Sequence, residues 1–470
     1  MSRGQIHRFE VHGRKLVLDV HSGSLHQVDD LVWELLEYYP DDCTPETLAP
    51  LRGRFGAEAV DEALAELDEL VERGWLFSPE PDWGDLLPRG DEPLRAICLN
   101  VAHACNLSCT YCFADKGRYG GPGALMPAAV ARQAVDLLLR LSRERPVCEV
   151  DFFGGEPLLN WPVVQDTVRY ARQAAAAAGK EMVFTLTTNG TLLTPEILDF
   201  LDRERVSLIL SVDGRPWVHD AMRSGSYDGV AQAVRAVLAR RAPGGVPAWA
   251  HGAAQGVSGA GAYAVVRGTF TSRNLDFAED AVHLMDVIGA PHFAIEPVVL
   301  RPEDPNALRP EHIPAVAAEY ERLAAILAER QRQGKVAVFH HFALEADQGP
   351  CLPRRIQGCG AGLQYLAVTP EGDLYPCHQF VGRPRFKLGT VWTGITATEV
   401  QQELVNCHVY SKAGCRECWV RYYCSGGCHA NAELVTGDIH QPDPVGCALV
   451  KKRVECALWL RAQAETGEDW

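Results

Sequence analysis

Three cysteines stand close together in an order that suits a metal cluster. Cys105, Cys109 and Cys112 have the spacing C-x3-C-x2-C within HACNLSCTYCF. Three thiolates on one loop can bind three irons of a [4Fe-4S] cluster and leave the fourth iron open, and thiolate is the ligand that such clusters prefer. Zinc is the alternative, but structural zinc sites take four ligands, and no histidine completes this set at a fitting spacing. The spacing therefore predicts an iron–sulfur site with one open iron.

A second group of cysteines lies near the carboxyl end of the sequence. Ten of the 16 cysteines fall between Cys351 and Cys456, and four of them are spaced C-x2-C-x5-C-x3-C from Cys415 to Cys428. Four-cysteine zinc sites also show such spacing, so this pattern alone leaves zinc and iron–sulfur clusters both open. The sequence lacks a signal-peptide stretch, so we expect a cytoplasmic protein, in which disulfides would be reduced. Metal or cluster binding is therefore the leading use of so many cysteines.

Strands that alternate with helices must position the first group. RAICLNV (95–101) predicts a buried strand directly before these cysteines, and a later strand ends in Gly154-Gly155-Glu156-Pro157. Six strands alternating with helices predict an α/β fold with a parallel, partly closed barrel, whose chemistry lies at the carboxyl ends of the strands. The predicted strands are 95–101, 147–157, 184–190, 207–214, 265–271 and 292–300, and the helical segments are about 127–143, 161–178, 194–204, 226–241 and 275–288.

The first 78 residues predict a small winged-helix-like domain. Its predicted elements are three strands within 5–28, helices from Asp29 or Asp30, from Thr44-Pro45 and from about Ala57, and a last short strand at Trp75-Leu76-Phe77. Residues 1–80 hold 17 acidic and 7 basic side chains, which argues against DNA as the partner. The other use of such a domain is to bind an extended peptide at a strand edge. The pattern resembles the peptide-recognition domain that binds leader sequences of ribosomally made, modified peptides, and a purely structural role is the alternative.

Composition and motifs divide the rest of the chain. Residues 79–93 are rich in Pro, Gly and acid and predict a linker, 94–335 the barrel, and 336–470 a cysteine-rich carboxyl-terminal domain. The Gly/Ala-rich residues 242–262 predict a flexible insertion. LQYLAVTPEGDLYPC predicts a hairpin with Gly372 at positive φ in its turn.

Composition and charge narrow the class of protein and its partners. The 470 residues are 47% apolar and 23% charged, which predicts a globular chain with a sizeable core. A net charge of −16 is not that of a nucleic-acid binder. No apolar run approaches the roughly 20 residues of a membrane span, and the first residues lack a signal-peptide stretch, so we expect a cytoplasmic protein without a membrane partner.

The first cysteine motif, with Tyr111 before its last cysteine, resembles that of the radical SAM superfamily. There the open iron binds the amino and carboxylate groups of S-adenosylmethionine (SAM), so the resemblance implies SAM and a [4Fe-4S] cluster as cofactors. Glycines allow a close approach of backbone to ligand, and a glutamate can accept a hydrogen bond from an ammonium. By resemblance, the SAM contacts are Tyr111, Gly154, Gly155, Glu156, Thr187, Asn189, Ser211 and Arg223, with Arg267 as a further candidate for the SAM carboxylate.

The carboxyl-terminal cysteines resemble those of the SPASM domain, which holds two auxiliary [4Fe-4S] clusters in its family. The resemblance assigns Cys359, Cys377 and Cys428 to the first auxiliary cluster, with Cys351 or a substrate thiolate on its fourth iron, and Cys415, Cys418, Cys424 and Cys447 to the second. Beside a radical SAM motif, this favours iron–sulfur clusters over zinc. Three such clusters contain about twelve irons.

The whole layout resembles that of peptide maturases, most closely those of SCIFF peptides, which are short ribosomally made precursors with six cysteines. The motifs VRGTFTSRNLDF, YPCHQFVG, CSGGCHANA and KKRVECALW carry this resemblance. It implies a thioether crosslink from a cysteine sulfur to another residue's α-carbon. It also implies a cysteine-rich precursor with a leader sequence as partner, and an electron donor such as flavodoxin or ferredoxin.

His378 bears on the alternatives to thioether formation. SPASM enzymes that form formylglycine carry an aspartate base directly after the cysteine equivalent to Cys377, where this chain has His378, itself a candidate catalytic residue. Carbon–carbon crosslinking of a peptide is a further alternative. A non-catalytic electron-transfer protein is the alternative from another class, and the open iron of the first motif argues against it.

Overall fold

The computed structural model describes residues 5–241, 262–335, 337–344 and 352–465. Nearly all of the predicted insertion (242–262) and the predicted ligand Cys351 lie outside the described residues. Within the described part, no helix is both long enough and apolar enough to cross a membrane.

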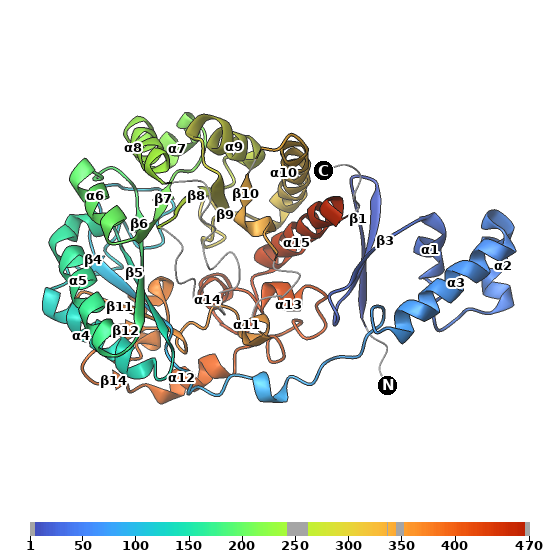
Figure 1. Cartoon of the computed structure of the whole chain (residues 1–470), viewed down its shortest axis with the longest axis horizontal. Helices are drawn as coiled ribbons and strands as arrows, with labels where there is room; N and C mark the ends of the chain where they lie inside the picture. Colours follow the sequence, from blue (N-terminus) through green and yellow to red (C-terminus); the bar gives the residue numbers. More distant parts are fainter. Residues whose placement is uncertain (1–4, 242–261, 336, 345–351, 466–470) are drawn as a thin grey trace.

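A large curved sheet forms the centre of the molecule, and the helices that follow its strands lie on its outer side (Figure 1). Six neighbouring strands are parallel and pair in the order of the sequence, which confirms the six predicted strands. They are β4 (Ala96–Ala102), β5 (Val147–Gly154), β6 (Glu181–Thr188), β7 (Val206–Ser211), β8 (Ala264–Phe270) and β9 (His292–Pro297).

The helices between these strands confirm the five predicted helical segments and add one that the sequence analysis missed, α7. They are α4 (Ala128–Leu141), α5 (Trp161–Ala177), α6 (Pro195–Arg203), α7 (Pro216–Met222), α8 (Tyr227–Arg240) and α9 (Phe277–His283), which a π-helical turn continues to Ile288. Helix α10 (Ile313–Arg332) follows β9 and packs against the last helix, α15 (Pro444–Glu465).

The two faces of the parallel strands differ in polarity. On β5, Val150 and Phe152 belong to the main apolar core under the helices, while Asp151 and Phe153 alternate with them and face the other way. On β8, Arg267 likewise faces away from the core that contains Val266 and Phe270. The inner face of the curved sheet is therefore the polar face, and it can line a reaction chamber.

The sheet does not stop at the boundary expected after residue 335. Strand β10 (Val338–Phe339) pairs parallel to β9, and β11 (Tyr365–Val368) pairs parallel to β4 at the opposite edge. Three short antiparallel strands follow: β12 (Asp373–Tyr375), β13 (Gly389–Thr390) and β14 (Gly394–Ile395). The pairing of β11 with β12 confirms the predicted hairpin, and Gly372 in its turn has the predicted positive φ of +87°.

Short helices build the cysteine-rich region after this hairpin. Their bounds are α11 (Leu352–Gln357), α12 (Thr398–Val405), α13 (Arg421–Cys424) and α14 (His429–Thr436), with a 3-10 turn at His378–Phe380. Regular structure is sparse here, so side-chain contacts and loop hydrogen bonds carry much of the positioning.

The amino-terminal region forms the predicted three strands and three helices. Its antiparallel sheet runs β1-β2-β3, and the elements are β1 (Ile6–Val11), β2 (Arg14–Asp19), β3 (Leu25–Val28), α1 (Asp30–Leu35), α2 (Pro45–Phe55) and α3 (Ala57–Glu72). Asp29 and Thr44 cap α1 and α2 through side-chain hydrogen bonds to Val32 N and Thr47 N. The strand predicted at Trp75-Leu76-Phe77 is wrong, because Phe77 has a φ of +49°, which breaks an extended conformation.

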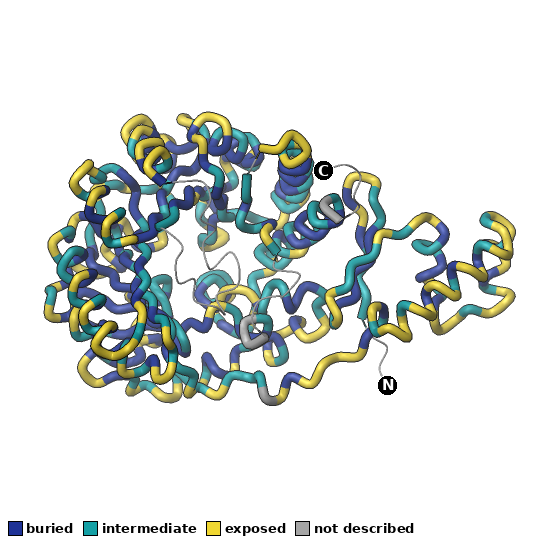
Figure 2. Tube along the Cα trace, viewed as in Figure 1, coloured by how far each residue is buried: buried dark blue, intermediate teal, exposed yellow. Residues whose placement is uncertain are grey.

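The amino-terminal sheet packs against the cysteine-rich region, while α2 and α3 project away from the molecule with exposed outer faces (Figures 1 and 2). The His7 ring stacks on Trp419 with centroids 3.7 Å apart. Trp83, in the segment predicted as a linker, is buried and donates a hydrogen bond from Nε1 to the Tyr422 hydroxyl at 3.1 Å. The sheet and this segment are thus docked on the loop that carries the later cysteines.

Candidate active site

The first cysteine group lies on the loop that leaves the carboxyl end of β4. All three thiols are half-buried, and burial raises the pKa of Cys109 to about 11, with Cys112 and Cys105 adding to the effect of burial. Cys105 Sγ accepts from Leu107 N at 3.4 Å and faces Asn189 Nδ2 at 3.9 Å. Thiols gathered on one loop and approached by N–H groups fit a bound cluster, because such donors stabilise thiolate sulfur.

The Gly-Gly-Glu segment after β5 packs directly against this loop. A Cβ at Gly155 would lie 2.2 Å from the carbonyl oxygen of Ala104, and one at Gly154 would lie 2.3 Å from that of Ala102. Gly155 N and Glu156 N donate to these same two carbonyls at 2.8 and 2.9 Å. The glycines therefore allow a close approach between the end of β5 and the cysteine loop itself.

Glu156 is buried at the centre of a small hydrogen-bond network. Its carboxylate accepts from the Thr188 hydroxyl at 2.8 Å, Asn189 N at 2.8 Å and Leu158 N at 3.1 Å. Burial raises its pKa to about 7 despite these donors. A carboxylate has about four acceptor positions, and these donors occupy three of those of Glu156.

The other predicted SAM contacts lie at the ends of neighbouring strands. Thr187 and Ser211 stand on the inner face of β6 and β7, and Ser211 is paired in register with Arg267 on β8. Tyr111 and Arg223 meet at a buried carboxylate, that of Asp213, which lies two residues after β7. The structure thus brings the predicted SAM contacts to one end of the barrel, around the first cysteine group.

Arg267 belongs to an ion-pair cluster on the β8–β9 side of the inner wall. Its Nη2 lies 3.3 Å from Glu296 Oε1, and His341 Nε2 lies 2.9 Å from Glu296 Oε2. Burial alone would raise the pKa of Glu296, but His341 and Arg267 beside it hold that pKa below its ordinary value. Nearly half of the Arg267 side chain stays exposed, so its guanidinium can still contact a ligand.

Three rings connect the first cysteine loop with the hairpin that carries Cys377. Phe113 follows Cys112, His378 follows Cys377, and the centroids of the Phe113 and His378 rings lie 5.6 Å apart. Phe153 on the inner face of β5 completes the group at 4.6 Å from the His378 ring. Burial lowers the pKa of His378 to about 4, so its imidazole is neutral near pH 7.

Cys359, Cys377 and Cys428 come together beside these rings, although their positions in the sequence are far apart. Burial raises the pKa of the Cys377 thiol, and the nearby thiols of Cys428 and Cys359 raise it further. The backbone N–H groups of Gln379 and Phe380 donate to Cys377 and act in the opposite direction. The three residues therefore lie within electrostatic range of one another, as expected of ligands to one cluster.

A separate group forms from the other four predicted ligands of the carboxyl-terminal region. Burial raises the pKa of the Cys447 thiol to about 11, and the thiols of Cys424 and Cys418 add to this shift. Cys415 in turn interacts with Cys447 and Cys418. Across the described residues, no three His, Cys, Asp or Glu side chains stand close enough to share a single metal ion, and the ligand sets stay predictions.

The sequence analysis missed several residues that shape the site. Asp213, Thr188 and Glu296 all make contacts with predicted site residues, yet none was singled out. Asp213 and Thr188 stand at strand ends next to predicted contacts, which is a signal that could have identified them. Glu296 gives no such signal, because its role depends on pairing between β8 and β9.

Comparisons with known proteins identify the class that this fold and site define. Residues 99–246 match the family model described as "Radical SAM superfamily". The mycofactocin maturase MftC of Mycobacterium ulcerans is 30% identical over 363 residues, which cover 74% of this chain and 87% of that protein. The chain therefore belongs to the radical SAM superfamily, and within it to the radical SAM peptide maturases.

Solved structures share the fold at much lower sequence identity. Native anSMEcpe with bound AdoMet superposes with a TM-score of 0.63 at 19% identity, covering 79% of this chain and 98% of that one. Streptococcus suis SuiB bound to precursor peptide SuiA gives a TM-score of 0.50 at 12% identity, covering 95% and 99%. The protein is a radical SAM enzyme, and the alternative of a non-catalytic electron-transfer protein is not retained.

Proposed function

We propose that this enzyme forms thioether crosslinks, from cysteine sulfur to an α-carbon, in a ribosomally made cysteine-rich precursor, like the SCIFF maturases it resembles. The observation that carries the proposal is the group of Cys359, Cys377 and Cys428 beside the inner face of the barrel. Three protein thiolates leave one iron of a four-iron cluster for a substrate thiolate. Cys351 is the alternative fourth ligand and lies outside the described residues.

The residues between the two sites suit a peptide segment that must reach both. When bound at Cys105, Cys109 and Cys112, a reduced cluster would supply the electron that cleaves SAM and starts hydrogen abstraction. Phe113, Phe153 and His378 form a ring-lined surface from this loop to Cys377. A substrate on these rings would have its acceptor carbon near SAM and its thiolate near the auxiliary cluster. Flavodoxin or ferredoxin is the proposed electron donor.

His378 favours a thioether over formylglycine. Its neutral imidazole stands where the formylglycine-forming enzymes carry an aspartate base, and its ring packs against Phe153 and Phe113. With its pKa lowered to about 4 by burial, it is a weaker base than an ordinary histidine. We therefore propose His378 as part of the wall that orients the substrate.

The amino-terminal domain offers a groove for the leader of the precursor. A cavity of about 350 Å³ lies between β3 and α3. Its lining includes Val28, Val32, Leu67 and Leu70, together with His26, Asp29 and Glu66. Strand β3 is at the edge of its sheet, and no described strand pairs with its outer side, so an extended leader can add there by main-chain hydrogen bonds. Tethering would give the reacting segment an effective concentration on the order of mM.

Mass spectrometry tests this function directly. The reconstituted enzyme is incubated with SAM, a reductant and a six-cysteine precursor peptide with its leader. We expect a loss of two hydrogens per crosslink, with fragmentation placing each bond between a cysteine sulfur and an α-carbon. SAM cleavage without any such mass loss would contradict the proposal. A Cys377→Ala variant should still cleave SAM but form no crosslink.

A second candidate is another oxidation of a precursor peptide, such as a carbon–carbon crosslink. The 30% identity to a mycofactocin maturase favours keeping it, because that level of identity over 363 residues is compatible with related but different peptide chemistry. Alkylation of every precursor cysteine separates the two candidates. Crosslinks that persist after alkylation would establish the carbon–carbon reaction and exclude the thioether.

A further inference from the structure

Asp213 holds the cysteine loop and a predicted SAM-binding arginine through one buried carboxylate. It lies two residues beyond β7, and its side chain is fully buried. The Tyr111 hydroxyl donates to its two oxygens at 2.8 and 2.7 Å, and Arg223 Nε donates to Oδ2 at 3.0 Å. Thr269 N, on β8, donates to Oδ1 at 3.0 Å. Three separate segments of the chain therefore converge on this carboxylate.

The backbone around Asp213 is closely packed on both sides. A Cβ at Gly268 would lie 2.5 Å from Val212 O and 3.0 Å from Asp213 Cα. Gly214, on the other side, has a φ of +138°, and a Cβ there would lie 2.3 Å from the Cβ of Asp280. The position of the carboxylate is thus fixed by close packing of β8 and α9 against the end of β7.

Arg223 is held by its Nε, which leaves the outer edge of the guanidinium for another partner. Among the described residues, its side chain makes no hydrogen bond besides the one to Asp213, and it lies over the Tyr111 ring at 5.5 Å. A guanidinium held on one edge presents Nη1 and Nη2 as a planar fork, which suits a carboxylate. Tyr111, between Cys109 and Cys112, ties the same unit to the cluster loop.

We propose that Asp213 is a positioning residue for SAM cleavage, which fixes Tyr111 and Arg223 relative to each other so that the cluster loop and the arginine fork bind SAM together. Asp213 itself does not touch SAM. The proposal rests on the prediction that Arg223 contacts SAM, and it takes the SAM carboxylate as the group that suits the free edge of the guanidinium. It does not depend on which peptide is modified or which bond is formed.

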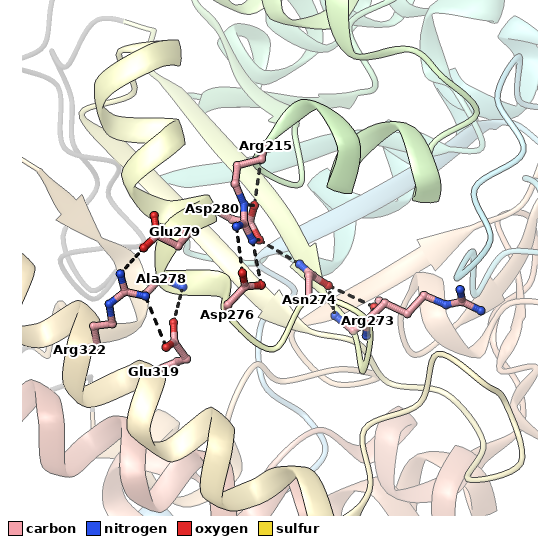
Figure 3. Close-up of polar contacts among 10 residues, drawn as sticks. Arg215, Arg273, Asn274, Asp276, Ala278, Glu279, Asp280, Glu319 and Arg322 are labelled. Atoms are coloured by element: carbon pink, nitrogen blue, oxygen red, sulfur yellow. Dashed lines mark hydrogen bonds and ion pairs between the residues drawn. The ribbon is translucent and has the colours of Figure 1, made fainter.

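A neighbouring aspartate provides a matched control. Asp280 is also fully buried and paired with an arginine: it accepts from Arg215 Nε at 2.8 Å and from Asn274 Nδ2 at 3.1 Å (Figure 3). Arg215 makes a second ion pair with Asp276 at 2.8 Å. Arg215 lies two residues after Asp213 along the chain, but among the described residues no hydrogen bond or ion pair of this network reaches the cysteine loop, so it tests the cost of losing a buried aspartate alone.

The test compares Asp213→Asn with Asp280→Asn in reconstituted full-length enzyme, with SAM as the probe. The amide loses the charge paired with Arg223 and one of the two accepting oxygens. We expect Asp213→Asn to keep its iron content and to raise the Kd for SAM about tenfold or more, the usual effect of losing a hydrogen bond to a charged group. The change that SAM causes in the EPR spectrum of the reduced cluster should weaken in parallel.

Asp280→Asn should lower the melting temperature and leave the Kd for SAM unchanged. An Asp213→Asn variant whose SAM affinity stays within twofold of the wild type would overturn the proposal, and so would an equal loss of affinity in Asp280→Asn. If Asp213→Asn does not fold, Tyr111→Phe replaces it, since it removes only the hydroxyl. That variant should raise the Kd about threefold, and an unchanged Kd would overturn the proposal.

Discussion

The two cysteine-bearing regions of this enzyme are held in place by different means. The first loop is fixed by the ends of parallel strands: Gly155 and Glu156 after β5, Asn189 after β6, and Asp213 after β7. The later cysteines lie among short helices and turns, and the amino-terminal sheet covers the loop that carries them. The first site is therefore set by backbone register, and the second by contacts between segments separated by 339 and 416 residues in the sequence.

The largest difference should appear when a cysteine is removed from each region. We expect Cys105→Ala to abolish 5′-deoxyadenosine formation and to lower the iron content by about four of about twelve atoms per chain. Cys418→Ala should lose a similar amount of iron and still cleave SAM. Iron analysis and chromatography of the nucleoside product measure both effects, with Cys43→Ala as the control. SAM cleavage that survives in Cys105→Ala would refute the division between the regions.

A glycine substitution tests the claim that backbone contact sets the first site. A Cβ at Gly155 would overlap Ala104 O, so Gly155→Ala must displace the cysteine loop. We expect a loss of SAM cleavage of about a hundredfold or more, since small misplacements of reacting groups have effects of that size. Gly121→Ala, within the cysteine loop itself, is the control, because the nearest contact of its Cβ would be an ordinary 3.6 Å to Arg118 O. Equal activity of the two variants would contradict the backbone argument.

A buried carboxyl group in the barrel should make the stability of the protein depend on pH. Burial raises the pKa of Asp151, on the inner face of β5, to about 7, with Glu149 adding to the shift. Between about pH 4 and 7 the folded chain keeps a proton that the unfolded chain has lost, so the free energy of unfolding falls as pH rises. The slope approaches about 1.4 kcal/mol per pH unit.

Asp151→Asn removes this titration. We expect the melting temperature of the wild type to fall more steeply from pH 5 to 7 than that of the variant, as measured by differential scanning calorimetry. Parallel curves for the two proteins would show that the carboxyl is not protonated in the folded chain.

The smallest expected effect concerns the cover over the second region. His7 stacks on Trp419, and its Nε2 lies 3.0 Å from Glu455 Oε1. We expect His7→Ala to lower the stability by about 1–2 kcal/mol, the size of a lost ring stack and hydrogen bond. It should also speed the loss of iron to a chelator, without changing SAM cleavage.

His12→Ala serves as the control, because His12 contacts Glu321 O on α10 and Trp459 on α15, and it does not stack on the Trp419 ring of the cysteine loop as His7 does. Its iron should be lost at the rate of the wild type. If the two variants lose iron equally fast, the amino-terminal sheet does not protect the second region specifically.

Local patterns in the sequence predict much of this fold. Alternation of apolar runs with helical periodicity identifies β4 to β9 and the helices between them, and Thr44-Pro45 identifies the start of α2. Each of these signals lies within the residues of the strand or helix that it predicts. Motif spacing predicts the first cysteine group, whereas the two carboxyl-terminal groups are predicted by resemblance to the SPASM domain.

Long-range pairing could not be predicted in the same way. The residue types at 365–368 do not predict that this segment pairs with β4, some 270 residues earlier in the sequence. This pairing places Cys377 near the first cysteine loop. Asp213 and Glu296 owe their roles to neighbours on adjacent strands. The strand expected at Trp75-Leu76-Phe77 fails because Phe77 takes a φ of +49°, which the residue types of this segment do not reveal.

The pairing of β11 with β4 has a consequence for how the chain can be divided. Strand β4 is fully buried along its length, and β11 covers the edge that β5 does not. An open edge of that kind pairs readily with other chains and promotes aggregation. A barrel fragment ending before residue 336 would therefore expose an apolar edge next to its cysteine loop, and it would be expected to self-associate rather than to serve as a minimal SAM-cleaving unit.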